Sequence, residues 1–341
     1  MARAAGAERP VTLGVEERSP IAARTKSKVT PKYKTKYRVE NWPAYEASLR
    51  QRGDVTVWFD EGAIGAWTAL PCGHPGGQQR YSDLAILTVL TLRRVFHLAL
   101  RQAEGFAASL IHLMGLDVET PDHTTLSRRS ATVVVPPPVP VQAGPIHLII
   151  DSTGLKMVGD GKWHVLKHTS ANKRRCWRKL HLGVDAGGFI VVSVLTESGV
   201  DDSSVGAAMI RGVGSGIKCF NADGAYDTRA VYEALAAIAG AEVKVVIPPR
   251  REATPSGDDV LRQRDAAIAR IAEVGRRRWR KEAAAHQQAS AENAMLRYKR
   301  IIGEALRARK MAAQRTETRI AVSVLNRMTT LGKPNSVAVV P

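Results

Sequence analysis

Residues 147–151 read HLIID, an apolar run that ends in a carboxylate, and the prediction of the whole fold grows from this segment. Its residue types favour a β-strand, and four further runs of similar texture follow it. They are KLHLGVD (179–185), FIVVSVLT (189–196), IKCFNAD (217–223) and VKVVI (243–247). Helical patterns near 203–212 and 229–239 flank the fourth run. This order predicts a mixed sheet with helices on its faces, and therefore an α/β fold.

The segment before this sheet has a different texture. Residues 133–145 read VVVPPPVPVQAGP, which suits a rigid spacer between domains. Upstream of it, three helices are predicted: one that begins after the N-cap Ser82, one from about Phe106 that ends at Gly115, and a short one over His123–Arg129. The first part of the chain is therefore predicted to be helical.

These textures predict five regions. We expect a disordered basic leader, a small helical domain, a proline-rich linker, a sheet-containing domain that becomes helical and basic after Arg250, and a tail. Their ranges are 1–31, 32–132, 133–145, 146–330 and 331–341.

The charge of the chain points to polyanionic partners. Among 341 residues, 50 Lys and Arg stand against 32 Asp and Glu, so the formal net charge is +18. Such a balance favours nucleic acid as a partner. No apolar stretch approaches the roughly 18 residues that a membrane span needs, and the first thirty residues lack the apolar core of a signal peptide. The spacing of Cys72, Cys176 and Cys219 fits no zinc or redox motif, so we expect a reducing cytoplasm.

Three acidic residues are candidates for a metal site. Asp151 closes the first strand-like run, Asp223 closes the fourth, and Glu292 lies early in a helix predicted between Ser290 and Lys310. Three carboxylates with open water positions suit Mg²⁺ or Mn²⁺, which support in-line phosphoryl displacement. The alternatives are turn residues at the strand ends, with Asp227 competing as the ligand, and an acid that caps the helix of Glu292.

The same predicted helix carries an apolar stripe. The stripe consists of Met295, Tyr298, Ile302 and Leu306, and Glu292 and Lys299 project from its edge. We expect both polar residues to face the sheet.

Two basic clusters contain a tryptophan each and are candidate DNA contacts. Cations of this kind release counterions when they bind phosphate, and an aromatic ring among them stacks on an unpaired base. One cluster is Lys173, Arg174, Arg175, Trp177, Arg178 and Lys179, preceded by Lys167 and His168; the other is Arg276, Arg277, Arg278, Trp279, Arg280 and Lys281. The alternative for each cluster is a solvated face with the tryptophan as an anchor. Arg128 and Arg129 end the third helix, where they either contact a major groove or complement the helix dipole.

Several linked motifs resemble the DDE transposases of the fifth bacterial insertion-sequence family. They occur in the family's order, and the resemblance extends over about 32–330. The motifs are DSTGLK (151–156), CWRKLHLGVD (176–185), ADGAYD (222–227) and AENAM (291–295), together with YSDLAILTVLTLRRVFHLALRQAEGF (81–106) and PDHTTLSRR (121–129).

The resemblance implies a ribonuclease-H-like catalytic core in which Asp151, Asp223 and Glu292 bind Mg²⁺ or Mn²⁺, with two ions expected. It implies that Lys299 contacts the transposon end, and that the substrate is double-stranded DNA. The chain departs from the family pattern just before Glu292. Where the family often has a tyrosine and an arginine, this chain has Ala285 and Gln288.

Three functions remain open from the sequence. The first is a transposase that cuts at the terminal inverted repeats of its element and joins the 3′ ends to target DNA. The second is an inactive derivative that binds inverted repeats as a repressor, which the departures at Ala285 and Gln288 motivate. The third is a metal-dependent nuclease without strand transfer. Because two ends must be cut together, the first predicts a homodimer or larger assembly on DNA.

Overall fold

The computed structural model describes residues 36–339 apart from 60, 72, 74–76, 139–143, 159–176, 240–242 and 284. The predicted leader therefore lies outside the described residues. The chain divides into two compact units, Asn41–Pro334 and the two terminal segments Met1–Glu40 and Asn335–Pro341. In the terminal unit, β1 (Lys36–Val39) pairs antiparallel with β8 (Ser336–Val339). Sequence patterns do not predict this pairing, because each strand has only four residues.

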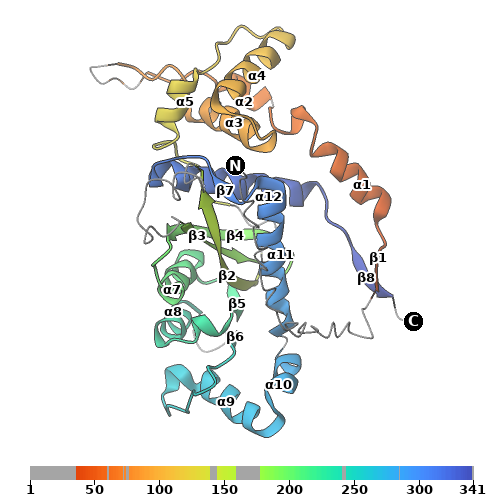
Figure 1. Ribbon diagram of the computed structural model, residues 1–341, viewed down its shortest axis with the longest axis vertical. Helices are drawn as coiled ribbons and strands as arrows, with labels where there is room; N and C mark the ends of the chain where they lie inside the picture. Colours follow the sequence, from red (N-terminus) through yellow and green to blue (C-terminus); the bar gives the residue numbers. More distant parts are fainter. Residues whose placement is uncertain are drawn as a thin grey trace, which may run out of the picture. The chain divides into compact units, whose positions relative to one another are not determined.

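The larger unit contains the mixed sheet. Its strand order is β4-β3-β2-β5-β6, and β7 pairs with β2 beside this path (Figure 1). The strands β2, β3 and β4 form an antiparallel meander, whereas β5, β6 and β7 run parallel to their neighbours. The bounds are β2 Ile146–Met157, β3 Trp177–Val184, β4 Ile190–Glu197, β5 Ile217–Asn221, β6 Lys244–Val246 and β7 Ala305–Leu306. The predicted α/β fold is confirmed, and the sheet agrees with a ribonuclease-H-like core.

Helices cover both faces of this sheet. One face packs against α7 (Asp202–Val213) and α8 (Arg229–Ala239), and the other against α11 (Ala289–Arg297) and α12 (Met311–Leu331). Since side chains alternate along a strand, neighbouring residues of β2 enter different cores. Leu148 and Ile150 lie in the α7–α8 core, while Ile149 and Leu155 lie in the other.

The helices outside these two layers follow the predicted order. Ser82 caps the predicted first helix through a bond from Ala85 N at 3.1 Å, and Asp122 caps the third. The bounds are α1 Trp42–Gln51, α2 Glu61–Gly65, α3 Asp83–Val95, α4 Leu100–Leu113, α5 His123–Arg129, α9 Arg262–Val274 and α10 Arg276–Glu282. Short turns lie at η1 Val55–Val57, η2 Gly224–Tyr226, η4 Asp259–Leu261 and η5 Ala285–Gln288. Residues on both sides of 133–145 belong to one compact unit, so the structure does not separate the two predicted domains. Their boundaries stay predictions.

Two predicted element ends are wrong. The first strand does not end at Asp151 but continues to Met157, because β3 pairs with it as far as Lys156. Asp151 is therefore a mid-strand residue rather than a turn residue. The fourth strand ends at Asn221, two residues before Asp223, and Asp223 instead caps η2.

The helix predicted between Ser290 and Lys310 is also shorter than expected. After α11 the chain makes a π-helical turn, η6 (Tyr298–Ile302), and leaves it at Gly303, whose φ is +109°. A left-handed residue of this kind ends a helix, and glycine adopts it without strain. Leu306 then pairs with Met157 in the sheet. The four residues of the apolar stripe are nonetheless all buried.

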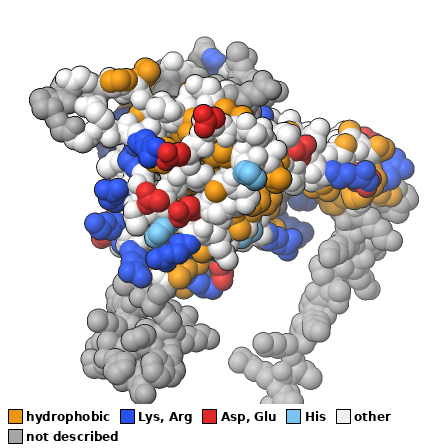
Figure 2. Space-filling model, turned by 90° about the horizontal axis from the view of Figure 1, so that it is seen from above, with side chains coloured by type: hydrophobic (Ala, Val, Ile, Leu, Met, Phe, Trp, Pro, Cys, Tyr) orange, Lys and Arg blue, Asp and Glu red, His pale blue; other side chains and the backbone are white. Residues whose placement is uncertain are grey.

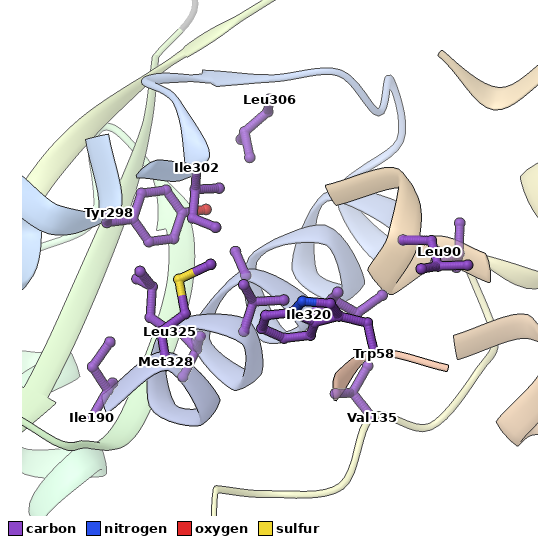
Figure 3. Packing of buried hydrophobic residues seen from close by; sticks show 14 of the residues in the cluster. Trp58, Leu90, Val135, Ile190, Tyr298, Ile302, Leu306, Ile320, Leu325 and Met328 are labelled. Atoms are coloured by element: carbon purple, nitrogen blue, oxygen red, sulfur yellow. The ribbon is translucent and has the colours of Figure 1, made fainter. Parts of the chain in front are cut away.

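The largest core joins the N-terminal helices to the sheet through α12. Leu90 of α3, Ile320 and Leu325 of α12, and Tyr298 of η6 belong to this single cluster. Figure 3 shows side chains of α12 between those of η6 and those of the N-terminal helices. Burial of this apolar surface therefore fixes the N-terminal helices to the sheet-containing part.

A buried ion pair lies within this junction. Arg94 Nη1 and Glu317 Oε1 are 2.9 Å apart, and their side chains are only 7% and 4% exposed. The Glu317 carboxylate also accepts bonds from the backbone N–H groups of Arg307, at 3.0 Å, and Ala308, at 2.8 Å. It therefore ties α3, α12 and the segment after β7 together.

Removal of the arginine should destabilise the fold strongly. In Arg94→Met the Glu317 carboxylate stays buried without its cation, which typically costs about 3–5 kcal/mol. Urea unfolding at pH 7.5 would measure this loss. Arg101→Met, at an exposed position of α4, is the control and should stay within about 0.5 kcal/mol of wild type. A loss below about 1 kcal/mol in Arg94→Met would show that the pair does not hold the junction.

The surface charges are distributed in groups. On the face shown in Figure 2, Lys and Arg side chains lie in separate groups, with Asp and Glu side chains between them. Within the described residues, no helix combines the length and apolar character that crossing a bilayer requires.

Candidate active site

The fold brings two of the predicted acids to one region of the sheet. The parallel pairing of β2 with β5 ends at Ile149 and Asn221. Asp151 follows the end of this pairing on β2, and Asp223 follows it after β5. Because parallel neighbours end at the same edge, the two residues lie in one neighbourhood. Glu292 lies in the first turn of α11, which packs against β2 and β3.

The carboxyl group of Asp151 is partly buried and lies among other acidic side chains. Burial, together with the negative charges of Asp223, Glu292 and Asp202, raises its pKa to about 6. A hydrogen bond from the N–H of Ser152, at 2.7 Å, acts in the opposite direction because it stabilises the ionised form. Asp151 therefore senses the charges of both other predicted acids.

Asp223 and its competitor Asp227 have different surroundings. Asp223 is exposed, and its Oδ1 accepts a bond from Ala225 N at 2.9 Å. Asp227 is buried and is bound by Arg264 Nε at 3.0 Å, by the Arg250 N–H at 3.1 Å and by the hydroxyl of Tyr232 at 3.3 Å. Its charge is already neutralised by a guanidinium, so Asp227 serves the structure and Asp223 stays the candidate ligand.

A pocket of about 830 Å³ opens beside these acids. Asp223 and Glu292 line it from two sides, from the turn after β5 and from α11. Most of its other charged residues are basic. They are Arg250, Arg251, Arg276, Arg280 and Lys281, with Glu252 as the acidic exception. The pocket thus joins a carboxylate edge to a cationic wall, an arrangement that suits a phosphodiester with an associated divalent cation.

The chemistry of the three acids fits a divalent cation. None of the three forms an ion pair with a Lys, Arg or His of the described residues, whereas Asp227 does. Clustered carboxylates without such a partner are stabilised by a hard cation. In the part of the chain that the structure describes, no three Asp, Glu, His or Cys side chains are grouped closely enough to hold a metal ion as they stand. Glu292 is exposed, so its side chain has room to approach the other two.

The predicted aromatic contacts with DNA are placed differently from expectation. Trp279 in α10 is only 6% exposed, so its ring anchors the helix and is not positioned to stack on a base. Trp177 is partly buried at the start of β3, where its ring lies against Gly154. Arg178 donates from Nε to Gln314 Oε1 at 3.0 Å. Trp177 and Arg178 are therefore structural contacts of the strand β3, and Trp279 is a structural contact of α10.

The remaining predicted DNA contacts have different surroundings. Arg129 donates to the carbonyl oxygen of Tyr81 at 3.0 Å and pairs with Asp83, so it is used internally. Arg128 is exposed at the end of α5 and lines a smaller pocket of about 420 Å³. Lys299 lies in η6, and Lys167, His168, Arg174 and Arg175 lie outside the described residues.

Two arginines that the sequence reasoning passed over line the pocket. Arg250 and Arg251 follow the strand β6 directly after Pro248 and Pro249. In α/β sheets, ligands bind where parallel strands end, so the string PPRR after a strand was a usable signal. A contact of Gln288 with β2 was also not predicted, because hydrogen-bond partners far apart in the sequence leave no local pattern.

On the opposite face of the sheet, β3 carries a buried histidine. His181 is fully buried, its Nε2 lies 3.0 Å from Thr196 Oγ1, and its Nδ1 lies 3.5 Å from Asp202 Oδ1. Burial lowers its pKa to about 4; Asp202 opposes this shift and Lys179 adds to it. His181 is therefore neutral in the folded protein near pH 7.

The pKa of His181 predicts a pH-dependent contribution to stability. Because the folded pKa lies below the ordinary value of about 6.5, the contribution is complete above pH 6.5 and is lost as the pH falls towards 4. Asp151, whose folded pKa is raised, acts with the opposite sign over an overlapping range. The difference between wild type and a His181→Gln variant, which does not titrate, isolates the histidine.

This difference in unfolding free energy should shrink by about 2 kcal/mol between pH 7.5 and pH 4.5. Urea unfolding in the presence of a chelator would measure it. A difference that does not change with pH would mean that the imidazole is not held neutral by burial.

Comparison with known proteins agrees with this architecture. Two family models match the chain, and both are described as a transposase DDE domain; one matches residues 50–160 and the other residues 142–327. The second match alone spans more than half of the chain and includes Asp151, Asp223 and Glu292. The assignment to the fifth insertion-sequence family stays a prediction. The mixed sheet, the acids at its edge and these matches lead to one conclusion: the chain belongs to the family of DDE transposases.

Proposed function

We propose that this transposase cuts DNA at the terminal inverted repeats of its element and joins the released 3′ ends to target DNA. The observation that carries the proposal is a pocket with a basic wall that Asp223 and Glu292 line, next to the end of the β2–β5 pairing that Asp151 follows on β2. The bacterial nucleoid, where such DNA lies, would be its place of action.

The proposed reaction consists of two in-line displacements at phosphorus. In the first, a water oxygen attacks the phosphodiester at the end of the element, and the bond from phosphorus to the 3′ oxygen breaks. In the second, the 3′ hydroxyl so formed attacks a phosphodiester of target DNA, whose own 3′ oxygen leaves. No bond between protein and DNA is formed in either step.

In this proposal, Asp151, Asp223 and Glu292 together hold Mg²⁺ or Mn²⁺, with two ions expected. Cations held there would supply a lowered pKa of a bound water and stabilisation of the charge on the attacking and leaving oxygens. Burial and the nearby carboxylates raise the pKa of Asp151, and a bound cation would favour its ionised form.

The basic wall of the pocket is proposed to hold the DNA backbone. Arg280 and Lys281 are exposed on α10 and line the pocket. Arg276 donates to the carbonyl oxygen of Pro249 at 2.7 Å, so it holds the loop that carries Arg250. The helix α10 is itself fixed to α9, because Glu282 of α10 accepts bonds from Arg270 of α9. A rigid wall of this kind positions phosphates without reading bases.

Other parts of the chain would contact DNA away from the cut. We include Lys299 as a contact with the transposon end, and Arg128 with α5 as a contact with the inverted repeat. Lys167, His168, Arg174 and Arg175 are further proposed contacts. Two copies of the chain acting together would bring both element ends to one target.

Neutralising one acid should abolish cleavage. Asp151→Asn removes a charge but keeps the oxygen that accepts from Ser152, so the fold should persist while cleavage of inverted-repeat duplex in Mg²⁺ falls at least about a hundredfold. Gel electrophoresis of nicked and joined products would measure both steps. Wild-type rates in Asp151→Asn would refute the assignment. Binding without cleavage by the wild type would favour a repressor, and cleavage without joining would favour a nuclease.

Removing one cation from the pocket should weaken DNA binding more than removing a neighbour on the same helix. Arg280→Ala takes away a pocket-lining charge, whereas the control Arg277→Ala removes an exposed charge that does not line the pocket. We expect the slope of log affinity against log salt to fall by about 1 in Arg280→Ala alone. Fluorescence anisotropy at salt concentrations from about 50 to about 200 mM would measure this slope. Equal slopes in the two variants would exclude the pocket from DNA binding.

A further inference from the structure

A single side chain connects the helix of Glu292 to the strand of Asp151. The amide of Gln288 donates from Nε2 to the backbone carbonyl oxygen of Ile150 at 3.0 Å. Gln288 is the last residue of η5 and the N-cap of α11. Because the bond joins residues far apart in the sequence, it fixes tertiary structure rather than a local turn.

This bond lies where the two parallel strands separate. The pairing of β2 with β5 ends at Ile149 and Asn221, so the Ile150 carbonyl belongs to the first residue of β2 beyond it. The turn η5 packs against both β2 and β5 at this point. A side-chain donor from η5 therefore reaches the strand just where its parallel neighbour ends.

Each of the three acids closely follows a residue at this point of the fold. Asp151 is the residue after Ile150, and Asp223 is two residues beyond Asn221. Glu292 lies four residues after Gln288, which places the two on the same side of α11, one turn apart. The position of Gln288 thus sets the position of Glu292 relative to the strand that carries Asp151.

We infer that Gln288 is a positioning residue for the cation site. Its amide holds the first turn of α11 against β2, so that the Glu292 carboxylate stays within reach of Asp151 and Asp223. This inference rests on the proposed function, because it assumes that the three acids share a cation. It gives a role in this chain to a position where the sequence departs from the family pattern.

The chemistry of the amide suits this role. Gln288 donates an N–H to a carbonyl oxygen and adds no charge next to the three carboxylates. A glutamate at this position would add a fourth carboxylate and could not donate this bond when ionised. Its Oε1 is buried and has no hydrogen-bond partner among the described residues. The donor is therefore the part of the side chain that the protein uses.

The test compares two variants of the full-length chain. Each is titrated with Mn²⁺ in the absence of DNA, and electron paramagnetic resonance measures the fraction of Mn²⁺ that is bound. Gln288→Met keeps the length of the side chain and removes the donor. Gln287→Met, on the preceding residue of η5, makes the same chemical change without touching the bond. We expect the Mn²⁺ dissociation constant to rise roughly three- to tenfold in Gln288→Met, as the loss of one hydrogen bond implies, and to stay within about twofold in the control.

A second readout separates positioning from a general loss of stability. In cleavage assays, Gln288→Met should need more Mg²⁺ for half-maximal rate, while the rate at saturating Mg²⁺ stays near wild type. A purely structural role would lower the thermal midpoint and the amount of active protein without moving the Mg²⁺ requirement. Gln288→Asn, whose amide is one methylene shorter, replaces Gln288→Met if that variant does not fold, and it should weaken Mn²⁺ binding as well.

The outcomes separate this inference from the proposed function. Wild-type Mn²⁺ affinity in the Gln288 variant, combined with loss of cleavage in Asp151→Asn, would overturn the positioning role and leave the function intact. A wild-type chain that neither binds Mn²⁺ nor cleaves DNA would overturn both. Weakened binding in the Gln288 variant alone, with the shifted Mg²⁺ requirement, supports the inference.

Discussion

The strand β2 contributes buried side chains to two hydrophobic cores and also carries the acidic residue Asp151. It pairs with β3 along most of its length, with β5 near its beginning and with β7 at its end. Its alternate side chains enter separate cores above and below the sheet. Asp151 lies within this strand, so its carboxylate is held by a backbone that cannot move without disturbing both cores. The position of Asp151 is therefore fixed by a strand that pairs with three others.

The charge balance around the sheet edge shows how the site differs from ordinary buried acids. Glu317 and Asp227 are also buried, and each is neutralised by an arginine and by backbone N–H donors. Asp151 is partly buried with one backbone donor, and burial together with the charges of three acids, Asp223, Glu292 and Asp202, raises its pKa. The protein thus keeps a local excess of negative charge where a cation would be bound, and it places arginines in the pocket next to it.

Much of the fold was predictable because its signals are local. The strand-like runs, the N-cap at Ser82 and the short helix after Asp122 are patterns of a few adjacent residues. The errors arose where a partner distant in the sequence decides the structure. Pairing with β3 and β7 extends β2 beyond Asp151, and Gly303 with the return of the chain to β2 ends the helix after Glu292. The burial of Trp279 was equally hidden, because a basic cluster looks the same whether its aromatic ring faces solvent or a helix.

The return of the chain from α11 to the sheet limits how Glu292 can move. Beyond η6, the segment 304–306 binds β2 through Lys156 N to the Glu304 carbonyl and Val158 N to the Leu306 carbonyl, both at 2.9 Å. At its other end the helix is attached to the same strand through Gln288. These attachments at both ends oppose any sliding of α11 along β2. Any approach of Glu292 to the other carboxylates must therefore come from rotation about its own side-chain bonds, a change of conformer that is fast and leaves the backbone in place.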